Sequence, residues 1–263
     1  MALVVVAMLA PLVACTDRRL NCDGSGPCTD DPPYQYAVTS VSLASTDQEA
    51  RAMGFDLNRD GISDNQLGRA LAANADVLDI PGLVASGVSD GRYIILGQVI
   101  AADLTNGGSH GDGVIFQLLR GGYPSTEHGR PSFAAYECCG HPYVDTSISD
   151  GTISGGPEIL TLPLYFGTDP FITLMYDAYV EGGPVSEETI GSLRVGGSLS
   201  LAVVQQQVLP ALRAQLPPGR TLDESLFVSD VPGVHDEAMS FALTLELTRA
   251  EFEIEFHDNT LLE

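Results

Sequence analysis

Short apolar runs separated by turn-forming residues constrain the fold of this chain more than any other feature. Over residues 36–43 apolar and polar side chains alternate, which is typical of a strand with one buried face. The 28 glycines and 16 prolines favour many turns and little long helix. The sequence therefore predicts a mainly β domain, either a β-sandwich or barrel-like, with two short helices and one acidic loop. Further strands are expected over 93–101, 114–119, 159–166 and 171–180.

Two strand-like segments near the C-terminus alternate with opposite parity. The first has apolar residues at 241, 243, 245 and 247, and the second has them at 252, 254 and 256. A one-residue shift would turn the apolar side toward water, so a bulge or a turn is expected between the segments. We interpret the glutamates at 251, 253 and 255 as a solvated face. Since the chain ends seven residues after Phe256, we leave open that a longer product completes the last sheet.

Two helices are predicted. One begins at Asp64 or Asn65 and ends at Asn74. The other covers 200–216, because apolar residues recur at helical spacing up to a Pro-Pro-Gly stop. Pro210 lies within this second helix and cannot donate to the carbonyl four residues earlier, so we expect a kink.

The charge balance excludes several mechanisms. All 12 basic residues are arginine, against 35 acidic residues, for a net charge of −23. Without lysine the chain has no Schiff-base lysine, no P-loop lysine and no Ser-x-x-Lys pair. So acidic a chain is a poor ligand for nucleic acid, and divalent cations are its more natural partners.

Residues 1–14 form an uncharged apolar run that is too short to span a bilayer. The run ends in Leu12-Val13-Ala14-Cys15, which resembles the lipobox of bacterial lipoproteins. The resemblance implies a signal peptide over 1–14, lipid on Cys15 as a membrane anchor, and a location in the cell envelope, at the outer membrane or the cell surface. No basic residue precedes the run, so we leave open that the natural start lies upstream.

Residues 15–34 are rich in Cys, Gly and Pro and are expected to tether the lipid to a globular domain over 35–263. Four further cysteines are disulfide candidates outside the cytoplasm: Cys22, Cys28, Cys138 and Cys139. Three pairings are open, among them a local bridge between Cys22 and Cys28. A zinc site in the Cys-Cys-Gly-His run at 138–141 is an alternative, although zinc ligands are normally spaced farther apart.

The strongest chemical signal is an acidic loop at 56–64. Calcium prefers six to eight oxygen ligands, and alternate positions of a tight loop can converge on one ion. Gly61 permits the sharp turn that such a loop needs. The candidate ligands are the side chains of Asp56, Asn58, Asp60 and Asp64 and the backbone carbonyl of Ile62.

This loop resembles the first nine positions of an EF-hand loop and the calcium loops of dockerins and thrombospondin type 3 repeats. The twelfth EF-hand position, normally a bidentate glutamate, is Leu67, so a missing ligand would come from Asn65, another loop or water. The segment 54–70 is also similar to one in secreted bacterial lipoproteins of no assigned activity. The alternative without metal is a turn whose Asp64 caps the following helix.

No catalytic residue is predicted. Gly87-Val88-Ser89-Asp90-Gly91 matches the Gly-x-Ser-x-Gly string of hydrolases, but a nucleophile elbow follows a strand and opens a helix, whereas here a strand-like run follows. We interpret Ser89-Asp90-Gly91 as a turn. The five histidines show no close metal-ligand spacing; they are His110, His128, His141, His235 and His257.

Together these features favour an exported, lipid-anchored, calcium-stabilised binding or structural protein that contacts another envelope protein or a surface polymer. The alternative is an envelope hydrolase with a metal site assembled from the loops around His110, His128 and His141.

Overall fold

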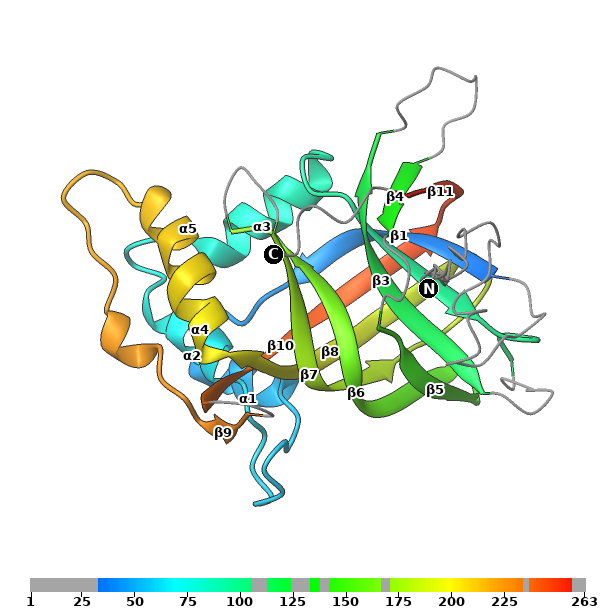
Figure 1. Cartoon of the computed structure of the whole chain (residues 1–263), viewed down its shortest axis with the longest axis horizontal. Helices are drawn as coiled ribbons and strands as arrows, with labels where there is room; N and C mark the ends of the chain where they lie inside the picture. Colours follow the sequence, from blue (N-terminus) through cyan, green and yellow to red (C-terminus); the bar gives the residue numbers. More distant parts are fainter. Residues whose placement is uncertain are drawn as a thin grey trace, which may run out of the picture.

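A closed antiparallel β-barrel forms the body of the molecule (Figure 1). The computed structural model describes residues 33–105, 113–123, 133–137, 142–166, 171–233 and 237–256. Eight strands follow one another around the barrel in chain order: β1 (Pro33–Ser42), β2 (Ile95–Ile100), β3 (Val114–Gly122), β5 (Val144–Ser149), β6 (Thr152–Leu164), β7 (Phe171–Gly182), β8 (Thr189–Ser200) and β10 (Glu237–Arg249).

The ring closes where β10 pairs with β1, and Tyr36 there lies opposite Arg249. The pairing of β3 with β5, which skips β4, completes the wall. The prediction of a mainly β, barrel-like domain is confirmed, and the closed ring decides for a barrel over a sandwich.

Large apolar side chains fill the barrel, as the narrow interior of eight strands allows. Alternate residues of each strand point inward, so the period-two pattern of the sequence becomes the core. The predicted apolar face of β10 is part of it, and Phe241 and Leu245 are both 1% exposed. Tyr36, Phe116 and Phe166 are also fully buried.

The expected bulge or turn between the two segments of opposite alternation is a break between two strands. Residues 250–251 lie outside any strand, and β11 (Phe252–Phe256) then pairs in parallel with β4 (Phe133–Glu137). The Gln35 side chain holds the start of β11, since its amide donates to the Phe252 carbonyl at 3.1 Å and accepts from the Phe252 N–H at 3.2 Å. Phe252 thereby packs in a small cluster apart from the main core, with Leu96, Leu119 and Ala135.

Three helices lie between β1 and β2: α1 (Asp47–Met53), α2 (Gln66–Ala73) and α3 (Ile80–Ser89). The predicted helix over this part is α2, with Asn65 and Asn74 as its caps. The expectation of only two helices is wrong, because α1 and α3 are also present. α1 is seven residues long and buries only Ala50, and proline, glycine and serine interrupt the apolar residues of α3, so neither helix shows a continuous apolar stripe in the sequence.

The second predicted helix runs from Leu201 to Ala214 and changes its winding on the way. It consists of α4 (Leu201–Val203), a π-helical turn η1 (Val204–Val208) and α5 (Leu209–Ala214). The Leu209 N–H donates to the Val204 carbonyl five residues back, directly before Pro210. The irregularity expected from Pro210 is thus a wider turn that precedes the proline.

Helices α2, α4 and α5 and the connection 183–188 lie at opposite ends of the barrel. Figure 1 shows α2, α4 and α5 grouped on one side of the molecule. The other end, which we call the barrel mouth, contains the start of β1, the connection 183–188 between β7 and β8, and the end of β10. A short helix η2 (Glu224–Leu226) and strand β9 (Val231–Pro232) precede β10. Within the described ranges, no helix has the length and apolar character needed to cross a bilayer.

Candidate functional site

The acidic loop folds into a compact turn held by its own side chains. The Asp56 carboxylate accepts from the N–H of Asp60 at 3.0 Å and from the N–H of Gly61 at 2.9 Å. Asn58 Oδ1 accepts from the same Asp60 N–H at 3.0 Å, and Asp60 Oδ1 accepts from the Ile62 N–H at 2.8 Å. Gly61 has φ +84°, the left-handed conformation that glycine adopts without strain. The alternating Asp/Asn pattern is therefore a chain of side-chain-to-backbone bonds.

Asp64 closes the loop from its other end. Its backbone N–H donates to the Phe55 carbonyl at 2.8 Å, and its carboxylate accepts from the Leu57 N–H at 2.9 Å. Partial burial raises the pKa of Asp64, and the nearby carboxylates of Asp230 and Asp60 act in the same direction. A bound cation would oppose both effects, because it favours the charged carboxylate.

The loop's ligand set is incomplete as it stands. In the part of the chain that the structure describes, no three Asp, Glu, His or Cys side chains group closely enough to hold a metal ion. The carboxylate oxygens of Asp56 and Asp60 nevertheless keep a lone pair each, since one N–H occupies one of the two. Leu67, at the position of the missing glutamate, is buried in the main core and cannot contribute.

The Asn65 side chain is buried and uses its hydrogen-bonding groups to cap α2 and to bond β10. It is 1% exposed, and its Oδ1 accepts from the N–H groups of Gly68 at 3.1 Å and Ala242 at 3.0 Å. Its Nδ2 donates to the carbonyls of Ala50 and Ala242, both at 3.2 Å. The alternatives in which Asn65 supplies a calcium ligand, or Asp64 caps the helix, are therefore wrong: Asn65 caps α2 and pairs with β10.

Contacts of Phe55 with the barrel wall hold the N-terminal end of the loop. Phe55 stacks on Tyr179 of β7 with 5.5 Å between ring centroids. The Arg194 guanidinium lies over the Phe55 ring at 4.8 Å and donates to the Ala52 carbonyl at 3.2 Å. A Cβ at Gly196 would meet the Phe55 ring at 2.7 Å, so the small residue permits the close approach. The loop is thus anchored to β7 and β8 at one end and to β10 at the other.

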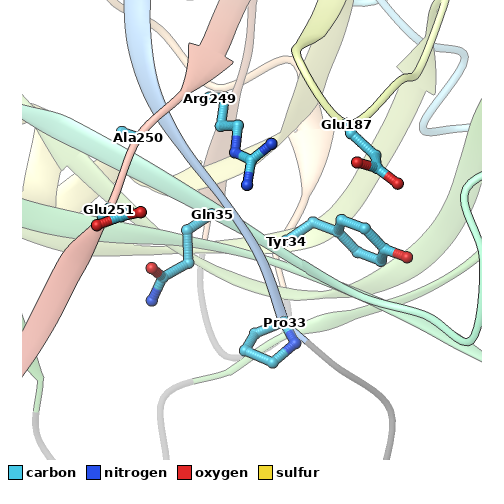
Figure 2. A pocket seen from close by; sticks show the side chains of 7 residues that line it. All are labelled: Pro33, Tyr34, Gln35, Glu187, Arg249, Ala250 and Glu251. Carbon is cyan, nitrogen blue, oxygen red and sulfur yellow. The ribbon is translucent and has the colours of Figure 1, made fainter.

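A second candidate site is a pocket of about 220 Å³ at the barrel mouth. Figure 2 shows the Arg249 side chain in the middle, with Glu187 and Tyr34 at one end and Gln35 and Glu251 at the other. No sequence pattern indicates this site, because its residues come from the start of β1, the 183–188 connection and the end of β10. The lining is completed by Pro33 and Ala250.

Several predicted residues lie outside the described part of the chain. They are Cys15, the disulfide candidates Cys22, Cys28, Cys138 and Cys139, and the histidines at 110, 128, 141, 235 and 257. Ser89 is described and ends α3, where its hydroxyl donates to the Ser86 carbonyl at 3.0 Å. It closes a helix rather than opening one, in agreement with the rejection of a nucleophile elbow. Gly91, with φ +69°, supplies the predicted turn.

Comparisons of the chain with family models, with curated proteins and with solved structures gave no match.

Proposed function

We propose that this protein is a calcium-stabilised binding or structural protein of the cell envelope, anchored by lipid on Cys15. The observation that carries the calcium part is the acidic loop, whose side-chain oxygens are fixed by backbone N–H groups while both of its ends are bonded to the barrel. The lipid anchor rests on the Leu-Val-Ala-Cys sequence at 12–15. The partner we propose is another envelope protein or a surface polymer.

Calcium would act by making the loop rigid and by holding it against the helix that follows, α2. The proposed ligands are the side chains of Asp56, Asn58, Asp60 and Asp64 and the carbonyl of Ile62, with water completing the shell. The ion would neutralise the carboxylates that bind it, and it would lower the pKa of Asp64, which burial and the carboxylates of Asp230 and Asp60 raise. Because the loop leads directly into Asn65, a rigid loop would also hold α2 and its contact with β10.

Calorimetric titration of calcium into the metal-stripped protein tests this proposal. We expect one saturable site, and a stabilisation of about 2.7 kcal/mol when free calcium is a hundred times Kd. Asp60→Ala removes a central ligand and should abolish both effects. Asp76→Ala removes a carboxylate that is also exposed but lies outside the loop, and it should leave both unchanged. Equal binding heat in all three proteins would mean diffuse attraction to an acidic surface and would contradict a site in the loop.

Membrane release tests the lipid anchor separately. Replacing Cys15 by Ser should move the protein from the membrane fraction into the supernatant when it is expressed in a bacterium with lipoprotein processing. The unaltered protein should stay with membranes in high salt, since acyl chains hold it by apolar burial rather than by charge. Continued sedimentation of the serine variant with membranes would refute lipidation at this position.

A further inference from the structure

The mouth pocket lies at the rim of the barrel, because Tyr34 packs against the main core whereas the neighbouring Gln35 side chain bonds Phe252 of the separate cluster. Tyr36 points into the core, and Arg249 lies directly opposite it on β10, so the two side chains share the inner face. Tyr34, two residues before Tyr36, also packs against the main core. The Tyr36 hydroxyl donates to the Ser186 carbonyl at 2.8 Å and so joins β1 to the 183–188 connection beside the pocket. Mouths of β-barrels are a recurrent place for small-ligand sites.

The pocket holds a cation with spare donors between two carboxylates. Arg249 makes one contact, from Nη1 to Glu188 Oε1 at 3.3 Å, which uses one of its five N–H donors. We find no further acceptor for its guanidinium among the described residues. Glu187 and Glu251 flank it on either side, as Figure 2 shows. By contrast, Arg213 makes two short bonds to one carboxylate, that of Glu224, at 2.7 and 2.6 Å.

The volume of the mouth pocket and the residues that line it indicate which class of ligand it can bind. A volume of about 220 Å³ is below the range of roughly 300–1,000 Å³ that drug-sized ligands occupy. The Tyr34 ring, Pro33 and Ala250 supply apolar walls. A simple anion would bind Arg249 but would be repelled by both glutamates. A simple cation would be attracted by both glutamates but repelled by Arg249.

We propose that the mouth pocket binds a small zwitterion with an aliphatic side chain. Its carboxylate pairs with the Arg249 guanidinium, which offers two parallel N–H donors to a planar acceptor. Its ammonium pairs with Glu187, beside the face of the Tyr34 ring, which also attracts cations. This binding goes beyond the proposed calcium-dependent function and uses none of the residues of the acidic loop.

Three matched probes test the proposal by NMR titration of the full protein labelled with nitrogen-15. L-Valine carries both charged groups, isovalerate lacks the ammonium, and isobutylamine lacks the carboxylate. We expect valine to shift the amide signals of Gln35 and Ala250 saturably, with each truncated probe binding about tenfold or more weakly. No saturable shift with valine, or equal affinity for valine and isovalerate, would overturn the proposal.

Variants locate the binding. Arg249→Gln should weaken valine binding about tenfold or more, and Glu187→Gln should weaken it while reducing the preference over isovalerate. Arg92→Gln is the matched control, because Arg92 also makes a single long ion pair, 3.4 Å to Asp90, with similar exposure (56% for Arg92 and 54% for Arg249). The thermal midpoint of each variant establishes that it is folded. Valine binding that is unchanged in a folded Arg249→Gln variant would refute the site.

Discussion

Replacement of Asn65 by alanine tests whether this side chain only caps α2 or also joins α2 to β10. A residue that only caps a helix contributes about 1 kcal/mol. Asn65 does more, because its amide also bonds both the N–H and the carbonyl of Ala242 on β10. We therefore predict that Asn65→Ala destabilises the protein by much more than the loss of a cap.

The magnitude follows from the groups that lose their partners. The Ala50 carbonyl keeps its bond from the Gly54 N–H at 3.1 Å and is not orphaned. The N–H of Gly68 and both polar groups of Ala242 lose the bonds that Asn65 makes. A buried polar group without a partner costs about 1–3 kcal/mol, and water entering the cavity relieves part of that cost. We expect a total loss of about 3–5 kcal/mol, a large share of the roughly 5–15 kcal/mol of a typical domain.

Urea denaturation followed by far-ultraviolet circular dichroism measures this loss. The control is Asp79→Ala, which removes the exposed cap of α3, a bond from the Gly82 N–H at 3.0 Å, and should cost about 1 kcal/mol. Both variants should keep the parental dependence of unfolding free energy on urea concentration. Equal losses in the two variants would show that the bonds to β10 add nothing and would refute the reasoning.

Two further predictions concern the barrel wall. Burial raises the pKa of Tyr165 to about 12, so above its ordinary value of 10.0 the unfolded chain loses this proton first and stability falls as the pH rises toward 12. Tyr165→Phe should flatten the alkaline dependence of the urea midpoint, and an unchanged slope would contradict the assignment. Gly196→Ala should cost about 1–3 kcal/mol and speed amide exchange in 55–64, because the new Cβ would lie 2.7 Å from the Phe55 ring. Gly191→Ala in the same strand, where the nearest side-chain atom is 3.4 Å away, should leave that exchange unchanged.

Local patterns predicted the elements whose burial has a clear period. The alternation in β1 and β10 and the stripe ending at Leu212 placed two strands and one helix correctly, because each packs one continuous face on the core. Strand β8 was not singled out, since Gly196 and Gly197 interrupt its apolar pattern. Those glycines are required by neighbours far away in sequence, Phe55 and Tyr176, which no local pattern reveals.

The candidate sites show the same limit. The acidic loop is visible in sequence because the bonds of its Asp56, Asn58, Asp60 and Asp64 side chains all lie within nine residues. Sequence patterns left open whether Asn65 begins the helix or supplies a calcium ligand, because its partner Ala242 lies near the other end of the chain. Closure into a barrel, and with it the mouth pocket, depends on the pairing of Tyr36 with Arg249, which is equally distant.

The order of strands around the ring has a consequence for how the chain folds. Seven of the eight neighbouring pairs join strands that follow one another in the barrel's chain order, whereas β10 and β1 come from opposite ends of the described sequence. Contacts between near neighbours form fast, and the last pairing carries the largest loop-closure cost. Because β10 is the last of the eight barrel strands to leave the ribosome, β1 exposes an unpaired edge during synthesis, and the same edge can capture β10 of another copy. Ring closure is therefore the step at which productive folding competes with strand exchange between chains.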